Sequence, residues 1–306
     1  MVILAGPTGS GKTSLAMELA ARISAEIVNA DSMQVYRRME IGTAKPTLHE
    51  RRIVPHHLID IADPDEPFDA ARYLKSAAPT IKEIQERGKL PLVVGGTGLY
   101  IRVLTRGLCQ GPPGDPEVKR KLVEAEKTKG LGELYLELSR IDPESAARIH
   151  QNDRQRIIRA LEVFHIGGKP LSALQERHGF REMLYPAIKV FINRERAELY
   201  ERIDRRVDRM IEAGFQSEVE GLLAMGYSAE LKSMQSIGYR QMCAHIAGKI
   251  SIEDAAIEIK RETRRYAKRQ ITWFGADREF CSFDADDIEG IYDYVRKAGE
   301  PPCNHG

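Results

Sequence analysis

The sequence predicts an α/β fold with a mostly parallel sheet and a helical insertion. In the first third of the chain, apolar strand-like runs alternate with helical patterns, which is typical of right-handed β-α-β units. A Gly/Pro-rich run at 107–117 ends this alternation, and only helical patterns follow it. Strand character returns at 187–193, "AIKVFIN". Both ends of the chain are therefore expected to build one core.

These changes of pattern define the expected domains. Helical patterns without strands extend to about residue 184, and long helices follow the returning strand to about residue 274. We expect residues 1–114 and 185–306 to form the core domain and residues 115–184 to form a helical insertion domain.

Local patterns predict the first elements of the core. The run "VILA" predicts a strand, and the helix after it carries Leu15, Leu19 and Ile23 on one face. A second strand, "AEIVNA", ends just before Asp31. A helix then extends from "FDAARYL" to Gly88, and the buried strand "LPLVV" leads into a glycine-rich turn.

Composition limits the class of protein. The 306 residues are 42% hydrophobic and 30% charged with a formal net charge of +1, as in ordinary soluble globular proteins. No apolar run approaches the roughly 20 residues that span a bilayer, and the N-terminus has no signal-peptide pattern. The four cysteines lack C-x-x-C spacing, which argues against a zinc module or disulfide framework and favours a reducing cytoplasm.

A phosphate-binding motif follows the first predicted strand. The run "GPTGSGKT" matches G-x-x-x-x-G-K-[ST] and predicts a P-loop NTPase-like core. Lys12 would bring charge to a terminal phosphate, and the Thr13 hydroxyl would bind Mg²⁺. The loop amides hold a diphosphate whatever is attached to it, so the motif does not identify the ligand. The predicted phosphate-binding residues are Gly6, Pro7, Thr8, Gly9, Ser10, Gly11, Lys12 and Thr13.

The strand "LPLVV" bears on the class of phosphate chemistry. A nucleotide hydrolase usually ends such a strand with an acid that helps to hold magnesium. Here Gly95, Gly96, Thr97 and Gly98 follow, and no acid is among them. This favours a group-transfer enzyme over a motor-type NTPase.

Asp31 follows the second predicted strand, at the edge where open α/β sheets bind ligands. Its carboxylate can serve as a general base beside the phosphates, or it can cap the following helix with Ser32, and the sequence supports both interpretations equally. Gln34 can form a paired hydrogen bond with an adenine edge. His56 and His57 would point to opposite faces of a strand, which favours structural roles over a shared metal.

Two predicted helices are strongly basic. In 152–164, Gln155, Arg156 and Arg159 lie on one side, and in 260–274 Lys and Arg form two adjacent stripes. Such helices are either exposed surface helices or contacts for a nucleic-acid backbone. The sequence leaves both alternatives open.

Several stretches occur in an order found in one family. The segments are "GPTGSGKT", "DSMQVYRRMEIGTAKP", "HHLIDI", "VGGTGLY", "NDRQRIIRALEVF", "SIGYRQ" and "YAKRQITWF". They span nearly the whole chain and together resemble the tRNA dimethylallyltransferase (tRNA isopentenyltransferase) family. Any one of them can occur by chance, but all of them in order make a highly specific match.

The resemblance implies a prenyl transfer. The loop would hold the diphosphate of dimethylallyl diphosphate with Mg²⁺, and the acceptor would be the exocyclic amine of the adenosine 3′ of the anticodon. Asp31 would take a proton from that amine. The implied catalytic residues are Asp31, Lys12, Thr13 and Thr97, and the implied further diphosphate ligands are Arg202 and Arg206.

The resemblance also implies contacts with the anticodon stem-loop of tRNA. Thr97 and Gln34 would meet the target nucleotide, and the helical insertion would hold the stem. The implied tRNA-contacting residues are Asp31, Ser32, Met33, Gln34, Thr97, Gln155, Arg156, Ile157, Ile158, Arg159, Gln235, Ser236, Ile237, Gly238, Tyr239 and Arg240.

One departure from the family pattern narrows the expectation. The eukaryotic branch typically carries a C-terminal zinc finger, and this chain lacks the Cys/His spacing for one. We therefore expect a bacterial-type enzyme without zinc, acting in the cytoplasm as a monomer with no membrane partner. The alternatives are a small-molecule or nucleotide kinase, which shares the loop and a helical lid, and a non-catalytic RNA-binding protein.

Overall fold

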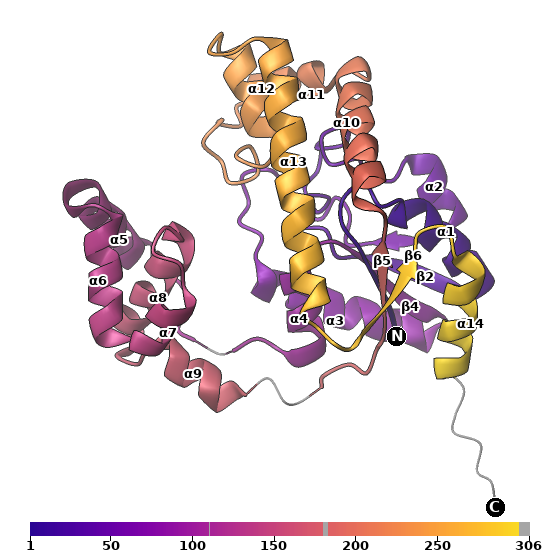
Figure 1. Ribbon diagram of the computed structural model, residues 1–306, viewed down its shortest axis with the longest axis horizontal. Coiled ribbons are helices and arrows are strands. Elements are labelled where there is room, and N and C mark those ends of the chain that lie inside the picture. Colours follow the sequence, from indigo (N-terminus) through magenta and orange to yellow (C-terminus); the bar gives the residue numbers. More distant parts are fainter. Residues whose placement is uncertain (110, 180–182, 300–306) are drawn as a thin grey trace, which may run out of the picture. The chain divides into compact units, whose positions relative to one another are not determined.

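The computed structural model describes residues 1–109, 111–179 and 183–299, and its six-stranded sheet has only parallel strand pairs in these ranges (Figure 1). The strand order is β3-β2-β4-β1-β5-β6. The predicted α/β class with a mostly parallel sheet is confirmed, and the last strand was not foreseen. The strands are β1 (Val2–Ala5), β2 (Ala25–Asn29), β3 (His56–His57), β4 (Leu90–Gly95), β5 (Ile188–Asn193) and β6 (Phe280–Asp284).

Helices make up most of the remaining structure. In the described ranges, no helix has the length and apolar character needed to cross a bilayer. The helices are α1 (Lys12–Arg22), α2 (Leu48–Ile53), α3 (Ala70–Glu86), α4 (Gly98–Arg106), α5 (Pro116–Lys129), α6 (Leu131–Ile141), α7 (Pro143–Arg148), α8 (Arg154–Gly167), α9 (Leu171–His178), α10 (Arg196–Glu212), α11 (Phe215–Ala224), α12 (Tyr239–Ile246), α13 (Ile252–Gly275) and α14 (Ile288–Gly299).

Both faces of the sheet are covered, which explains why β1 is apolar throughout. Val2 and Leu4 belong to a buried cluster with side chains of α1 and α14. Ile3 and Ala5 belong to a second cluster with side chains of α3, α4 and α13. Strands of parallel sheets read as continuous apolar runs when helices cover both faces.

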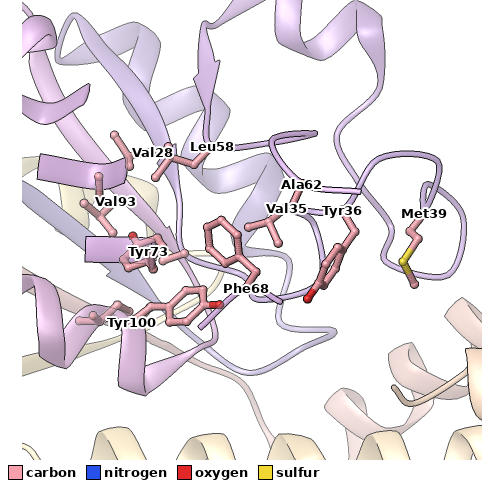
Figure 2. Packing of buried hydrophobic residues seen from close by; sticks show 14 of the residues in the cluster. Val28, Val35, Tyr36, Met39, Leu58, Ala62, Phe68, Tyr73, Val93 and Tyr100 are labelled. Atoms are coloured by element: carbon pink, nitrogen blue, oxygen red, sulfur yellow. The ribbon is translucent and has the colours of Figure 1, made fainter. Parts of the chain in front are cut away.

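Part of this core anchors the segment that follows β2, as Figure 2 shows. Tyr73 of α3 stacks on Tyr100 of α4 with the ring centroids 4.2 Å apart. Val35 and Met39, from the segment after β2, are fully buried in the same cluster. The segment between β2 and α2 is described throughout and forms turns and one isolated bridge rather than a helix. Apolar packing therefore fixes this segment.

The chain divides into two compact units. The core unit comprises Met1–Thr105 and Tyr185–Gly306 and contains the sheet, whereas the helical unit comprises Arg106–Leu184 and contains α5 to α9. The helical unit has its own buried cluster, in which Leu138 and Leu161 are fully buried. It is thus organised around its own hydrophobic core, as domains are.

The first boundary lies earlier than the residue 115 expected from the sequence, between Thr105 and Arg106. Residues 112–115 of the Gly/Pro-rich run pack on α8. Arg159 Nη2 donates to the carbonyl oxygen of Pro112 at 2.9 Å, and the backbone N–H of Asp115 donates to Glu162 at 3.1 Å. These contacts assign the segment to the helical unit.

Candidate active site

The phosphate-binding loop joins β1 to α1 at the carboxyl edge of the sheet. Gly11 is the N-cap of α1 with a φ of 92°, and Gly9 has a φ of 84°. A Cβ at Gly9 would lie 2.9 Å from Cγ1 of Ile203, so conformation and packing both require glycine there. The loop leads into the amino-terminal end of α1, whose unpaired N–H groups suit an anion.

The two arginines of α10 implied as diphosphate ligands both contact this loop. Arg202 Nε donates to the carbonyl oxygen of Gly9 at 3.0 Å. Arg206 Nη1 donates to the Thr8 hydroxyl at 3.2 Å. Both guanidinium groups therefore lie beside the predicted phosphate site.

Arg194 is a third arginine at the loop, and no sequence motif revealed it. Its Nε donates to the carbonyl oxygen of Ser10 at 3.3 Å, and its Nη atoms contact the carboxylates of Glu198 and Asp286. The side chain is buried. One sequence feature could have identified Arg194 as a site residue. It directly follows β5, at the edge where parallel sheets bind ligands.

Lys12 and Asp31 are electrostatic neighbours. Lys12 Nζ donates to the carbonyl oxygen of Pro7 at 3.3 Å. Burial lowers the pKa of Lys12 to about 8, the Asp31 carboxylate opposes this shift, and Arg206 adds to it. Burial also lowers the pKa of Arg206, again opposed by Asp31. One carboxylate and two cations from distant segments therefore share one site.

The Asp31 carboxylate is hydrogen-bonded through one of its two oxygens. Its Oδ1 accepts a hydrogen bond from the backbone N–H of Met33 at 2.8 Å, and its own N–H donates to Asn29 Oδ1 at 3.0 Å. The side chain thus caps a turn, but no helix follows it. Its Oδ2 accepts no hydrogen bond from the residues that the structure describes, so one oxygen remains to take a proton.

Thr97 lies where the ends of β2 and β4 meet. Its N–H donates to the carbonyl oxygen of Ala30 at 3.1 Å, and its hydroxyl accepts from the N–H of Ser32 at 3.0 Å. Tyr266 of α13 lies beside them. Desolvation and the Asp31 charge raise the pKa of Tyr266 to about 12, while hydrogen bonds with Thr97 and Gln270 oppose the rise.

Gln270 and Tyr266 are site residues that sequence analysis missed. Gln270 is 5% exposed and bonds both the P-loop and the glycine turn after β4. Both residues belong to the segment "YAKRQITWF", which was assigned to the family pattern without a role for either. Their partners lie too far away in the chain for local spacing to identify them.

The segment 34–45 folds back on itself. Gln34 Nε2 donates to the carbonyl oxygens of Thr43 and Ala44, each at 3.3 Å. Lys45 is buried, and its Nζ donates to Asp60 at 2.6 Å and to the carbonyl oxygen of Tyr36 at 2.7 Å. The Gln34 amide is thus held at the sheet edge by its own loop.

A carboxylate of α11 clamps the same segment. Glu218 accepts hydrogen bonds from three successive N–H groups, those of Glu40, Ile41 and Gly42, at 2.6 to 3.1 Å. The Tyr239 hydroxyl also donates to Glu218, at 2.6 Å. The segments "IGTAKP" and "SIGYRQ" are therefore locked together.

Residues 235–240, which the resemblance implied as a tRNA contact, include one end of this clamp. The structure describes all six of them. Tyr239 is buried, and Ile237 packs against the main core cluster. Gln235 and Arg240 are exposed. The interior members of this run support the loop, and the exposed members are the ones able to meet a ligand.

The same distinction holds on α8. Ile157 and Ile158 are buried in the helical unit's cluster, so their side chains are not surface contacts. Gln155 and Arg156 are exposed. Arg159 Nη1 donates to the buried carboxylate of Glu162 at 2.6 Å, which gives this arginine a structural partner.

The basic stripes of α13 are partly explained by packing. Lys260 forms an ion pair with Asp208 at 2.5 Å, and Arg264 forms one with Asp204 at 3.0 Å. Both acids lie on α10, which packs alongside α13. These contacts favour the surface-helix alternative for this stripe.

Thr13 is the predicted magnesium ligand. Its side chain lines a cavity of about 20 Å³ together with Asn29 and Gln34, which has room for one water-sized occupant. The Thr13 hydroxyl forms no hydrogen bond with any described residue. The described ranges contain no group of three or more His, Cys, Asp or Glu that could hold a metal. The Thr13 hydroxyl is an oxygen donor, the type of ligand that Mg²⁺ takes, so this residue fits the predicted role.

The histidines 56 and 57 have structural partners. His56 Nδ1 contacts the carbonyl oxygen of Val54 at 2.7 Å, and His57 Nε2 contacts Glu26 at 2.7 Å. The structure agrees with their interpretation as structural residues.

Known proteins share this sequence and fold. The chain matches the family described as IPP transferase over residues 34–277 and the family described as isopentenyl transferase over residues 1–60. The tRNA dimethylallyltransferase of Syntrophobacter fumaroxidans is 60% identical over 305 residues, which cover 100% of this chain and 89% of the relative. This chain belongs to the tRNA dimethylallyltransferase family. The resemblance inferred from the sequence segments is confirmed.

Further relatives and solved structures support the assignment to the tRNA dimethylallyltransferase family. The enzyme of Geobacter metallireducens is 55% identical over 279 residues, covering 91% of this chain and 90% of the relative. The solved structure of the tRNA isopentenylpyrophosphate transferase from Bacillus halodurans has a TM-score of 0.72 and 40% identity, covering 97% and 95% of the two chains. A eukaryotic dimethylallyltransferase, solved acting on tRNA, has a TM-score of 0.80 and 29% identity, covering 97% and 77%.

Proposed function

We propose that this protein transfers the dimethylallyl group of dimethylallyl diphosphate to the exocyclic amine of the adenosine 3′ of the anticodon in tRNA, releasing diphosphate. The observation that carries the proposal is the proximity of the Asp31 carboxylate to Lys12 and Arg206 at the phosphate-binding loop. A proton acceptor beside a diphosphate cradle suits this transfer, and the 60% identity to a tRNA dimethylallyltransferase supports the choice of substrates.

On the donor side, the residues stabilise the leaving group. Departure of diphosphate leaves an allylic, cation-like carbon, so charge develops mainly on the diphosphate oxygens. Lys12, Arg202, Arg206 and the loop N–H groups are in place before the reaction, and such fixed charges and dipoles stabilise developing charge strongly. Mg²⁺, held on the protein side by Thr13, would neutralise further charge on the diphosphate.

On the acceptor side, the residues orient and deprotonate the amine. As the bond from the allylic carbon to the diphosphate oxygen breaks, a bond from that carbon to the amine nitrogen forms, and the amine proton passes to Asp31 Oδ2. Thr97 and Gln34 would contact the adenine. The base must leave the anticodon stack to enter the site, which costs a few kcal/mol that tRNA contacts offset.

The exposed residues of α8 would contribute to those contacts. Gln155 and Arg156 point to solvent on the helical unit, and an exposed guanidinium suits a phosphate backbone. The proposal includes a cytoplasmic enzyme that works as a monomer.

One assay tests the proposal. The purified protein is incubated with Mg²⁺, labelled dimethylallyl diphosphate and an unmodified tRNA transcript, and the nucleosides are analysed after digestion. We expect label in the adenosine 3′ of the anticodon. Absence of label from tRNA, or an ATP-dependent phosphorylated product from a small-molecule acceptor, contradicts the proposal and favours a kinase.

A further inference from the structure

Gln270 connects the two halves of the candidate site. It lies in α13 and is 5% exposed. Its Oε1 accepts a hydrogen bond from the backbone N–H of Thr8 at 2.9 Å, and its Nε2 donates to the carbonyl oxygen of Gly96 at 2.9 Å. One side-chain amide therefore joins the P-loop to the turn after β4.

One end of this bridge contacts a residue with a proposed role, and the other end contacts the neighbour of such a residue. Thr8 belongs to the phosphate-binding loop, and its hydroxyl accepts from Arg206 at 3.2 Å. Gly96 directly precedes Thr97, whose hydroxyl accepts from the N–H of Ser32 beside Asp31 at 3.0 Å. The Gln270 amide thus spans from the donor-side loop to the acceptor-side turn.

The fit around this amide is close. A Cβ at Gly96 would lie 2.1 Å from Gln270 Nε2, so the side chain occupies the space that any larger residue would need. The bridge needs a donor and an acceptor on one short group, which a carboxamide supplies. A buried N–H or C=O left without its partner is costly, so the pair of contacts holds both backbone segments in one arrangement.

We propose that Gln270 is a positioning residue that keeps the allylic carbon of the donor aligned with the acceptor amine. The proposal rests on the proposed function. Reaction requires the two reacting atoms to be held about 3 to 3.5 Å apart, and a displacement of about 1 Å can lower the rate about 100-fold.

Loss of this alignment between the two reacting atoms has a specific chemical consequence. If the diphosphate still departs while the amine is misplaced, water attacks the allylic carbon in place of the amine. The oxygen of water bonds to that carbon, the carbon–oxygen bond to diphosphate breaks, and the water proton leaves to solvent. The products are dimethylallyl alcohol and diphosphate. The ratio of alcohol to prenylated tRNA therefore reports alignment rather than folding or binding.

The test compares Gln270→Met with Gln85→Met, a matched change at an exposed glutamine of α3. Gln270→Met keeps the length of the side chain and removes its hydrogen bonds to Thr8, Gly96 and Tyr266. We expect kcat for transfer to fall about 10- to 100-fold, KM for both substrates to change less than about threefold, and the ratio of alcohol to prenylated tRNA to rise about tenfold. Gln85→Met should match the wild-type protein in all three.

A second variant keeps the test decisive if Gln270→Met does not fold. Gln270→Glu retains an acceptor for the Thr8 N–H and sets a carboxylate oxygen against the carbonyl oxygen of Gly96, so it should also raise the ratio. An unchanged ratio in a folded Gln270 variant overturns the inference, whatever happens to kcat. A wild-type protein that prenylates no tRNA overturns the proposed function instead, so the two failures are distinguishable.

Discussion

The two units of this protein use their arginines in different ways. In the core unit, Arg194, Arg202 and Arg206 come from one stretch of chain and all donate to residues of the phosphate-binding loop. In the helical unit, Arg156 pairs with Asp153 at 3.3 Å on the exposed side of α8, and Arg159 pairs with a buried glutamate.

The difference separates the cations by their role. Arg202 and Arg206 add positive charge beside the predicted phosphate-binding loop, so their charge is available to a ligand. Arg194 differs from them, because Glu198 and Asp286 already pair with it.

The charge of Arg159 is balanced by the buried Glu162, whereas the guanidinium of Arg156 lies on the exposed side of α8, where RNA can reach it. An arginine-rich pattern therefore indicates function only when the folded structure leaves its charge facing a ligand site.

The largest expected effect tests whether the chemistry lies in the core unit. Asp31→Asn keeps an oxygen for the Met33 N–H but removes the proton acceptor. We expect kcat for prenyl transfer to fall about 1000-fold, within the range for lost general-base catalysis, with tRNA affinity largely kept. Asp65→Asn, at an exposed position, is the control. Rates within tenfold of wild type for Asp31→Asn would contradict the role of this carboxylate.

The next prediction tests the structural role of Arg159. Arg159→Met leaves the carboxylate of Glu162, which is 5% exposed, without its cation. We expect the free energy of unfolding to fall by about 2 kcal/mol, measured by urea titration. Adding Glu162→Gln should restore part of it, since no buried charge then remains. Unchanged stability together with a large loss of tRNA affinity would assign Arg159 to the RNA instead.

A pH dependence tests the charge on the donor side. Lys12 has its pKa lowered from 10.5 to about 8, so affinity for inorganic diphosphate should fall above about pH 8 by up to tenfold per pH unit. Between about pH 8 and 10.5 the folded state binds fewer protons than the unfolded state, so Lys12 makes stability rise with pH there. Calorimetric titration and urea unfolding measure the two trends. Lys12→Met should lose both, and their persistence in that variant would exclude Lys12 as the source.

The smallest effect concerns the exposed arginine of the helical unit. Arg156→Gln should raise KM for tRNA about two- to threefold, leave kcat unchanged and reduce the slope of log affinity against log salt by about one. Arg120→Gln on α5 is the matched control, because Arg120 is equally exposed and pairs with Glu117 three residues away. Equal effects of the two variants would show that only general surface charge matters.

Some of the site followed directly from the sequence, since it depends on short-range spacing. The glycine loop, Lys12 and Thr13 form a local motif between a strand and a helix, and Asp31 follows the next strand. Parallel strands bring their carboxyl ends to one edge, so the meeting of Asp31 with the loop was predictable. The order of the seven matching segments indicated the family, which the relatives confirm.

The tertiary structure alone decided which side chains support that edge. Thr8 and Gln270 are 262 positions apart, and Gly96 and Gln270 are 174 apart, so no local spacing reveals their bonds. The sequence left open whether the basic stripe of α13 contacts RNA, and the structure shows that Asp204 and Asp208 of α10 neutralise part of it. Local motifs specify which chemical groups are present, but hydrogen bonds and ion pairs between distant segments determine which of those groups remain free to react.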